Sequence, residues 1–183
     1  VMKGLAESGN ETRLIDLYAE GFDPVMGCDE RRVHNEMLKD QHPLPAHAEQ
    51  LAWAEGLVFV YPTWWYGLPA MLKGWLDRVM VPGAAFTMPK AEGETIGPGL
   101  THITRLGVFT TCGASWWLTR FVGAPGRRTL LRGIGVLCAP GRRSVFAAHY
   151  LMDSATRPRL ERHLRKVDRQ VRRLCVGLRG RPG

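Results

Sequence analysis

The chain has 183 residues and a formal net charge of +8. This length predicts a single domain over 1–183 that is long enough to bury a core of its own. No run of eighteen apolar residues and no secretory signal is visible, so we expect no membrane span and a cytoplasmic protein. Four scattered cysteines, without a CxxC pair or a Cys/His cluster, indicate reduced thiols and no metal site.

The positive charge is confined to the end of the chain. Residues 157–183 hold ten Lys/Arg and two Asp/Glu, which accounts for the whole net charge, and residues 1–156 are balanced. Apolar residues recur there every three or four positions, at Leu160, Leu164, Val167, Val171, Leu174 and Leu178. That stripe predicts a helix packed on a sheet with a solvated arginine face. No aromatic interleaving or nucleic-acid motif accompanies it, so we expect no nucleic-acid partner.

Apolar runs and helical periodicities alternate along the chain. In chain order they predict a strand over 13–17, a helix over 45–54, a strand over 57–61, a helix over 69–80, a long loop over 82–104, a strand over 106–111, a helix over 127–137, a strand over 144–149 and a helix over 157–178. Such alternation is typical of the α/β class with a mostly parallel sheet. The six histidines are isolated, and we expect surface or core positions for them.

Three consecutive aromatic residues follow the strand predicted over 57–61. Pro62 and Thr63 are succeeded by Trp64, Trp65 and Tyr66, then by Gly67 and a helix. Ligands of open α/β sheets bind at the carboxyl ends of strands, so these rings predict a site for a flat, partly apolar ligand such as a flavin. Packing against the sheet is the alternative interpretation of the same rings.

A second strand end supports the ligand interpretation. The strand over 106–111 leads into Cys112, Gly113, Ala114 and Ser115. Small and hydroxyl residues there offer backbone N–H groups and hydroxyls to the polar edge of a ring.

Two stretches of the chain follow a known pattern. The first runs YPTWWYGLPAMLKGWLDRV from Tyr61 to Val79 and continues as PGAAF over 82–86, and the second is TTCG over 110–113. They resemble the NAD(P)H:quinone reductase family of flavodoxin-like oxidoreductases, which is related to the ancillary flavoproteins of potassium-efflux systems. Weaker similarity through 15–24 and from 130 to the last helix extends the resemblance over nearly the whole chain.

The resemblance implies an α/β fold, a flavodoxin-like open parallel sheet with helices on both faces. It implies FAD or FMN as cofactor, NAD(P)H as electron donor, a quinone-like acceptor and a homodimer whose interface lies near 69–80 and 82–99. The residues that it places around the flavin are Pro62, Thr63, Trp64, Trp65, Tyr66, Gly67, Thr110, Thr111, Cys112 and Gly113.

The start of the chain departs from the family pattern. Members open with a strand and a loop that holds the flavin phosphates at a helix N-terminus, whereas residues 1–9 look like the end of that first helix. In the strand order 2-1-3-4-5 this absence predicts an unpaired edge on the strand over 57–61. A fragment or misplaced start, a naturally short chain that repacks or borrows a strand, and a scaffold that has lost flavin are the alternatives. The valine at position 1 favours the first.

A second departure concerns proton transfer. Some quinone reductases use a Tyr and a His after the second flavin loop, but residues 115–121 read SWWLTRF, so that pair is not carried over and no catalytic residue is assigned. Trp116 and Trp117 either wall the site or pack beneath the loop. The expected function is transfer of two electrons from NAD(P)H to a quinone-like acceptor. The alternatives are a flavin-free binding or regulatory module on the same scaffold and an inactive fragment.

Overall fold

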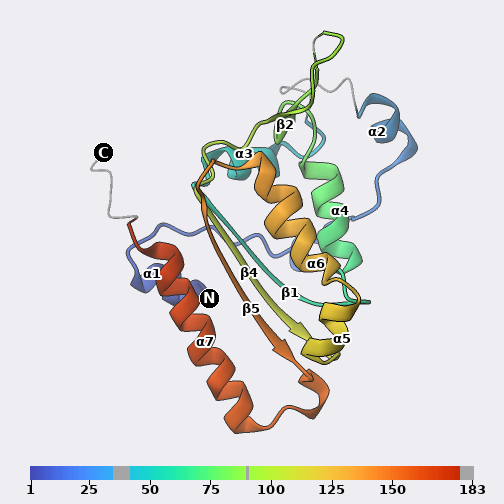
Figure 1. Ribbon diagram of the computed structural model, residues 1–183. Coiled ribbons are helices and arrows are strands. Elements are labelled where there is room, and N and C mark those ends of the chain that lie inside the picture. The colour runs from blue at the N-terminus through green and yellow to red at the C-terminus, as the bar shows by residue number, and fades with distance from the viewer. Residues whose placement is uncertain (35–41, 90, 178–183) are drawn as a thin grey trace.

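The computed structural model describes residues 1–34, 42–89 and 91–177 (Figure 1). Its centre is a parallel sheet of β1 (Gly56–Pro62), β4 (Arg105–Cys112) and β5 (Arg143–Tyr150), in the order β1-β4-β5. Every residue of β4 from Leu106 to Phe109 is buried, as expected of a central strand that is covered on both faces. The three strands predicted over 57–61, 106–111 and 144–149 are therefore confirmed.

Helices cover both faces of this sheet, which confirms the predicted fold class. One face carries α4 (Ala70–Val79) and the helical segment made of α6 (Pro125–Arg128), η2 (Thr129–Ile134) and η3 (Gly135–Leu137). The other face carries the long helix α7 (Arg157–Cys175) with the short helix α1 (Met2–Glu7) beside it. Each face has its own apolar core, and all three strands have their carboxyl ends at the same edge.

The remaining elements lie around this framework. They are α2 (Cys28–Val33), α3 (Pro45–Trp53), the antiparallel pair β2 (Phe86–Thr87) and β3 (Gly97–Pro98), α5 (Trp116–Phe121) and η4 (Met152–Ser154). The helix predicted over 45–54 is confirmed. The segment predicted as one long loop over 82–104 instead contains the small β2–β3 pair, and α2 and α5 were not predicted.

The strand predicted over 13–17 is wrong. Residues 11–16 form no regular structure, although Ile15 and Leu17 pack against the core of the α4 face. A strand needs a hydrogen-bonded neighbour, and within the described residues β1 pairs only with β4. The predicted unpaired edge of β1 is therefore present, and Val60 in that strand is 65% exposed.

Helix α7 confirms most of the apolar stripe predicted near the chain end. Val167, Val171 and Leu174 are buried against the sheet, whereas Leu164 is 60% exposed and lies off the contact. Leu178, the last predicted member of the stripe, lies outside the described residues.

The helical segment over 125–137 matches the helix predicted over 127–137 but is not uniform. Its middle, η2, is a π-helix, and a 3₁₀ turn ends it. π-Helical turns are rare and occur mostly within α-helices. The segment nonetheless buries Leu130 and Ile134 against the sheet, so it keeps its contacts with the core despite the irregular winding.

Candidate functional site

The loops after β1 and β4 are joined where the two strands end. The backbone N–H of Thr63 donates to the carbonyl of Thr111 over 2.7 Å, and the hydroxyls of Thr63 and Thr110 are 2.8 Å apart. Thr110 also donates its hydroxyl proton to the Thr111 carbonyl, so Thr63 is the donor to Thr110. The parallel register thus brings the two sequence-predicted loops side by side.

The aromatic residues after β1 form a tight turn. The Gly67 N–H donates to the Trp64 carbonyl over 2.9 Å, and the two residues between them, Trp65 and Tyr66, have φ values of 47° and 63°. Positive φ at both central positions is a conformation that Asn and Gly favour. For bulky aromatic residues it costs about 1–3 kcal/mol each. This strain sets the turn apart from an ordinary surface loop.

The turn places its rings in solvent. Trp64 is 63% exposed and Trp65 is 91% exposed, whereas Tyr66 and Gly67 are half-buried and Pro62 is exposed. Packing against the sheet, the alternative interpretation of these rings, is therefore wrong for both tryptophans. Exposed indoles on a strained turn are available to stack on a flat molecule.

Helix α6 holds this turn from the other side. The N–H of Gly126 donates to the Tyr66 carbonyl over 3.3 Å. A Cβ at Gly126 would lie 3.2 Å from the hydroxyl of Tyr61 and 3.2 Å from the carbonyl carbon of Gly67. The absence of a side chain at Gly126 therefore lets the helix approach both the end of β1 and the turn.

The loop after β4 contributes mainly backbone. Thr110 and Cys112 are buried, Thr111 is half-buried and Gly113 is exposed. The thiol of Cys112 points inward, 3.7 Å from the hydroxyl of Thr119. Since these side chains turn away from solvent, the Thr-Thr-Cys-Gly stretch can present N–H groups and the bare Gly113 to a ligand.

Helix α5 begins at this loop and displays further apolar side chains. The Ser115 hydroxyl accepts from the Leu118 N–H over 3.2 Å and caps the helix. Trp116, Trp117 and Phe121 are 55%, 71% and 79% exposed. The two tryptophans therefore do not pack beneath the loop but face solvent.

Tyr150 lies at the edge of the candidate site and was not singled out from the sequence. It ends β5 and pairs in register with Cys112 at the end of β4. Burial raises the pKa of the Tyr150 hydroxyl, and the neighbouring Cys112 raises it further, while Arg127 and Arg120 oppose the shift. The strand predicted over 144–149 ends one residue before Tyr150. The rule that ligands bind at the carboxyl ends of strands would therefore have pointed to Tyr150.

The site fits a flavin in the chemistry that it offers. Among the described residues, the N–H groups of Trp65, Tyr66 and Gly113 have no partner within the protein. Free N–H donors beside exposed aromatic rings match the polar edge and the apolar face of an isoalloxazine.

The described residues contain no group of three or more His, Cys, Asp or Glu side chains that could hold a metal ion. None of the helices in the described ranges has both the length and the apolar content for a membrane crossing.

This arrangement defines the class of open α/β proteins with a ligand site at the carboxyl ends of parallel strands. Comparison with known proteins is more specific. The chain belongs to a protein family that is described as having a flavodoxin-like fold. The sequence pattern of this family matches residues 1–171.

Similar proteins carry oxidoreductase names. An uncharacterized NAD(P)H oxidoreductase of Haemophilus influenzae is 36% identical over 92 residues, which is 50% of this chain and 44% of that protein. NAD(P)H dehydrogenase (quinone) 1 of Cavia porcellus is 33% identical over 105 residues, 47% of this chain and 37% of that protein. The solved NAD(P)H:quinone oxidoreductase of Methanothermobacter marburgensis has a TM-score of 0.74 at 25% identity and covers 93% of this chain and 86% of its own. The chain spans less than half the length of the two curated relatives.

Proposed function

We propose that the chain is a flavin-dependent NAD(P)H oxidoreductase that delivers two electrons to a quinone-like acceptor. The observation that carries the proposal is the strained turn over 64–67, which displays two exposed indoles beside the loop over 110–113. Strain of this kind persists where a fixed geometry serves a ligand. The oxidoreductase names of similar proteins support the same reaction class.

The proposed roles follow from what each group offers. A bound FAD or FMN would supply the two-electron chemistry. Trp64 and Trp65 would flank its ring, and the free N–H groups of Trp65, Tyr66 and Gly113 would bond its polar edge. The Thr63–Thr110 hydrogen bond would keep the two loops at a fixed separation. The remaining expected residues, Pro62, Gly67, Thr111 and Cys112, would shape the backbone of the same two loops.

We further propose that the chain forms a homodimer and is located in the cytoplasm. The exposed apolar side chains of α5, Trp117 and Phe121, suit the homodimer that the resemblance implies, because a second copy would cover them. All four cysteines are free thiols, which supports a reducing cytoplasmic setting.

Flavin binding and turnover test the proposal in sequence. Titration of FAD and of FMN, followed by quenching of flavin fluorescence, should give saturable binding of one or both. Steady-state rates with NADH or NADPH and a benzoquinone should then give parallel double-reciprocal lines, since donor and acceptor would use the site in turn. A cooperatively folded protein that binds neither flavin would reject the enzyme and favour a flavin-free binding module.

A further inference from the structure

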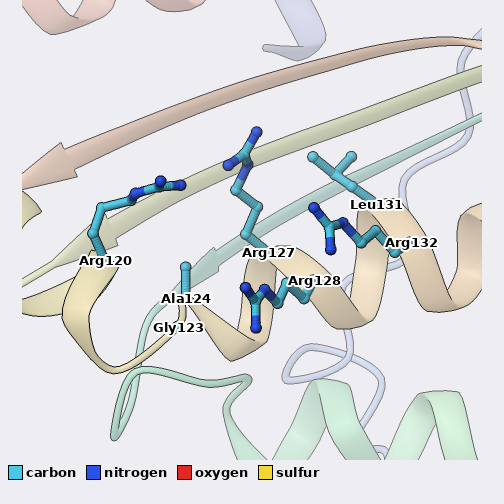
Figure 2. Close-up of a pocket in the computed structure, with 7 residues that line it drawn as sticks. All are labelled: Arg120, Gly123, Ala124, Arg127, Arg128, Leu131 and Arg132. Atoms are coloured by element: carbon cyan, nitrogen blue, oxygen red, sulfur yellow. The ribbon is translucent and has the colours of Figure 1, made fainter.

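Four arginines gather on the α6 side of the site. Arg120 comes from α5, and Arg127, Arg128 and Arg132 come from α6 and η2 (Figure 2). With Gly123, Ala124 and Leu131 they line a cavity of about 80 Å³, and we name the four side chains the arginine cradle. Positions 127, 128, 131 and 132 lie three to five residues apart on one side of the helical segment, so the clustering follows from helical spacing.

In the part of the chain that the structure describes, no acidic side chain forms an ion pair with the cradle. Instead, two of its arginines rest on aromatic rings: Arg120 lies 6.0 Å from the centroid of Trp116, and Arg127 lies 5.1 Å from that of Phe146. Like charges at helical spacing repel one another. The cradle therefore keeps four positive charges close together, and a bound anion would reduce their mutual repulsion.

The size and lining of the cavity identify the kind of anion. A single water needs about 10–15 Å³ of such a volume, so about 80 Å³ suits a group the size of phosphate and not a whole nucleotide. Leu131 is the one large apolar side chain in the lining, which disfavours a flat ring. Guanidinium groups match phosphate oxygens through paired, charge-assisted hydrogen bonds.

The cradle is continuous with the candidate flavin site. Tyr150 pairs in register with Cys112 at the strand ends and lies within electrostatic reach of Arg120 and Arg127. The same helix that carries Arg127 and Arg128 bonds to the aromatic turn through Gly126 and Tyr66. A molecule whose reactive ring lies at the strand ends could therefore extend a phosphate into the cradle.

We propose that the arginine cradle is a phosphate-binding subsite that receives a phosphate group of the NAD(P)H donor. This proposal rests on the proposed function for the identity of the donor, while the affinity of the cradle for phosphate stands on its own lining. The same chemistry could come from the diphosphate of either donor or from the 2′-phosphate of NADPH alone.

The first experiment uses inorganic pyrophosphate and the full chain at constant ionic strength. The melting temperature and the tryptophan fluorescence are followed for wild type, for Arg127→Gln/Arg128→Gln and for the matched control Arg162→Gln/Arg169→Gln on exposed positions of α7. Wild type and control should show the same saturable response. The cradle variant should bind at least tenfold more weakly, since removal of one charge-assisted hydrogen bond weakens binding by about that factor. Equal responses in all three proteins would overturn the subsite.

The second experiment identifies the donor without needing turnover. Binding of NADPH and of NADH is measured by energy transfer from tryptophan, with and without competing pyrophosphate. Weaker NADPH binding by the cradle variant and displacement by pyrophosphate support the proposal. An effect confined to NADPH assigns the 2′-phosphate, and an equal effect on both donors assigns the diphosphate. Unchanged NADPH binding, or a decrease in flavin affinity alone, would overturn the donor assignment. Failure of quinone reduction would instead count against the proposed function.

Discussion

The hydroxyl of Thr63 lies 2.8 Å from that of Thr110, across the ends of two neighbouring parallel strands. Thr110 in turn donates to the Thr111 carbonyl, so one chain of hydrogen bonds ties the aromatic turn to the second loop. A ligand that contacts both loops depends on the distance between them, and these hydrogen bonds fix that distance.

Replacement of Thr63 by Val should uncouple the two loops. The change keeps the shape of the side chain but removes the donor to Thr110, which is buried. We expect a decrease of about 1 kcal/mol in the free energy of unfolding, measured by urea denaturation. We also expect flavin affinity to fall several-fold, and Thr63→Ser, which keeps the hydroxyl, to restore most of both. Equal affinity in Thr63→Val and wild type would show that the bond does not position the loops.

Trp65 allows backbone strain to be separated from ring stacking. Its ring is 91% exposed and its φ is 47°, so the side chain contributes little packing and the backbone is strained. Trp65→Gly should be about 1 kcal/mol more stable than Trp65→Ala, because glycine adopts positive φ without steric cost. Both variants should bind flavin more weakly than wild type, because both lack the indole. If the two variants unfold at the same urea concentration, the turn is not strained.

Gly74 tests the contact between α4 and the segment before α2. A Cβ at this position would collide with the carbonyl oxygen of Pro24 and lie 2.5 Å from its Cα. Because backbone atoms cannot move aside cheaply, Gly74→Ala should cost about 1–3 kcal/mol. Gly133→Ala is the matched control, since nothing lies within 4 Å of its Cβ position. In that helical segment the control should be neutral or stabilising by up to about 1 kcal/mol.

Tyr61 should make stability fall at alkaline pH. Burial raises the pKa of its hydroxyl from 10.0 to about 12. The folded state therefore holds the proton more tightly than the unfolded state, and the resulting stability is fully present below pH 10. It is lost as the pH rises from about 10 to 12, by about 2–3 kcal/mol in total. Urea denaturation across this range should show a shallower decline for Tyr61→Phe than for wild type, and identical declines would contradict the assignment.

The fold was largely predictable because its main elements carry long periodic patterns. The apolar runs of β1, β4 and β5 and the apolar face of α4 need no knowledge of distant partners. The segment over 13–17 has the same local pattern as a strand, but strand formation depends on a neighbour elsewhere in the chain. Residues 13–17 therefore do not form a strand because they lack a pairing partner, and not because their local sequence disfavours a strand.

The sequence predicts where the candidate site lies on the sheet but not the conformation of its loops. The rule that ligands bind at strand ends located the loops after β1 and β4. The left-handed turn at Trp65 and Tyr66 was not visible, because neither residue is a glycine or asparagine. The N-cap of α5 could have been found from Ser115 before an apolar run. The arginine cradle joins Arg120 of α5 to arginines of the next helix, and how these two helices face each other is not visible in the sequence.

The π-helical turn of η2 is matched by the spacing of the buried residues in the sequence. Apart from Gly135, the residues that the segment and its end bury are Gly126, Leu130, Ile134 and Cys138, which recur at intervals of four. An α-helix repeats every 3.6 residues, so each step of four would rotate the next buried residue by about 40° and carry Cys138 about a third of a turn away. A wider turn in the middle absorbs part of that rotation. Deleting one residue there would restore α-helical winding but rotate either the arginines or the buried row out of place. The core contacts and the arginine cradle therefore depend on the same helical repeat.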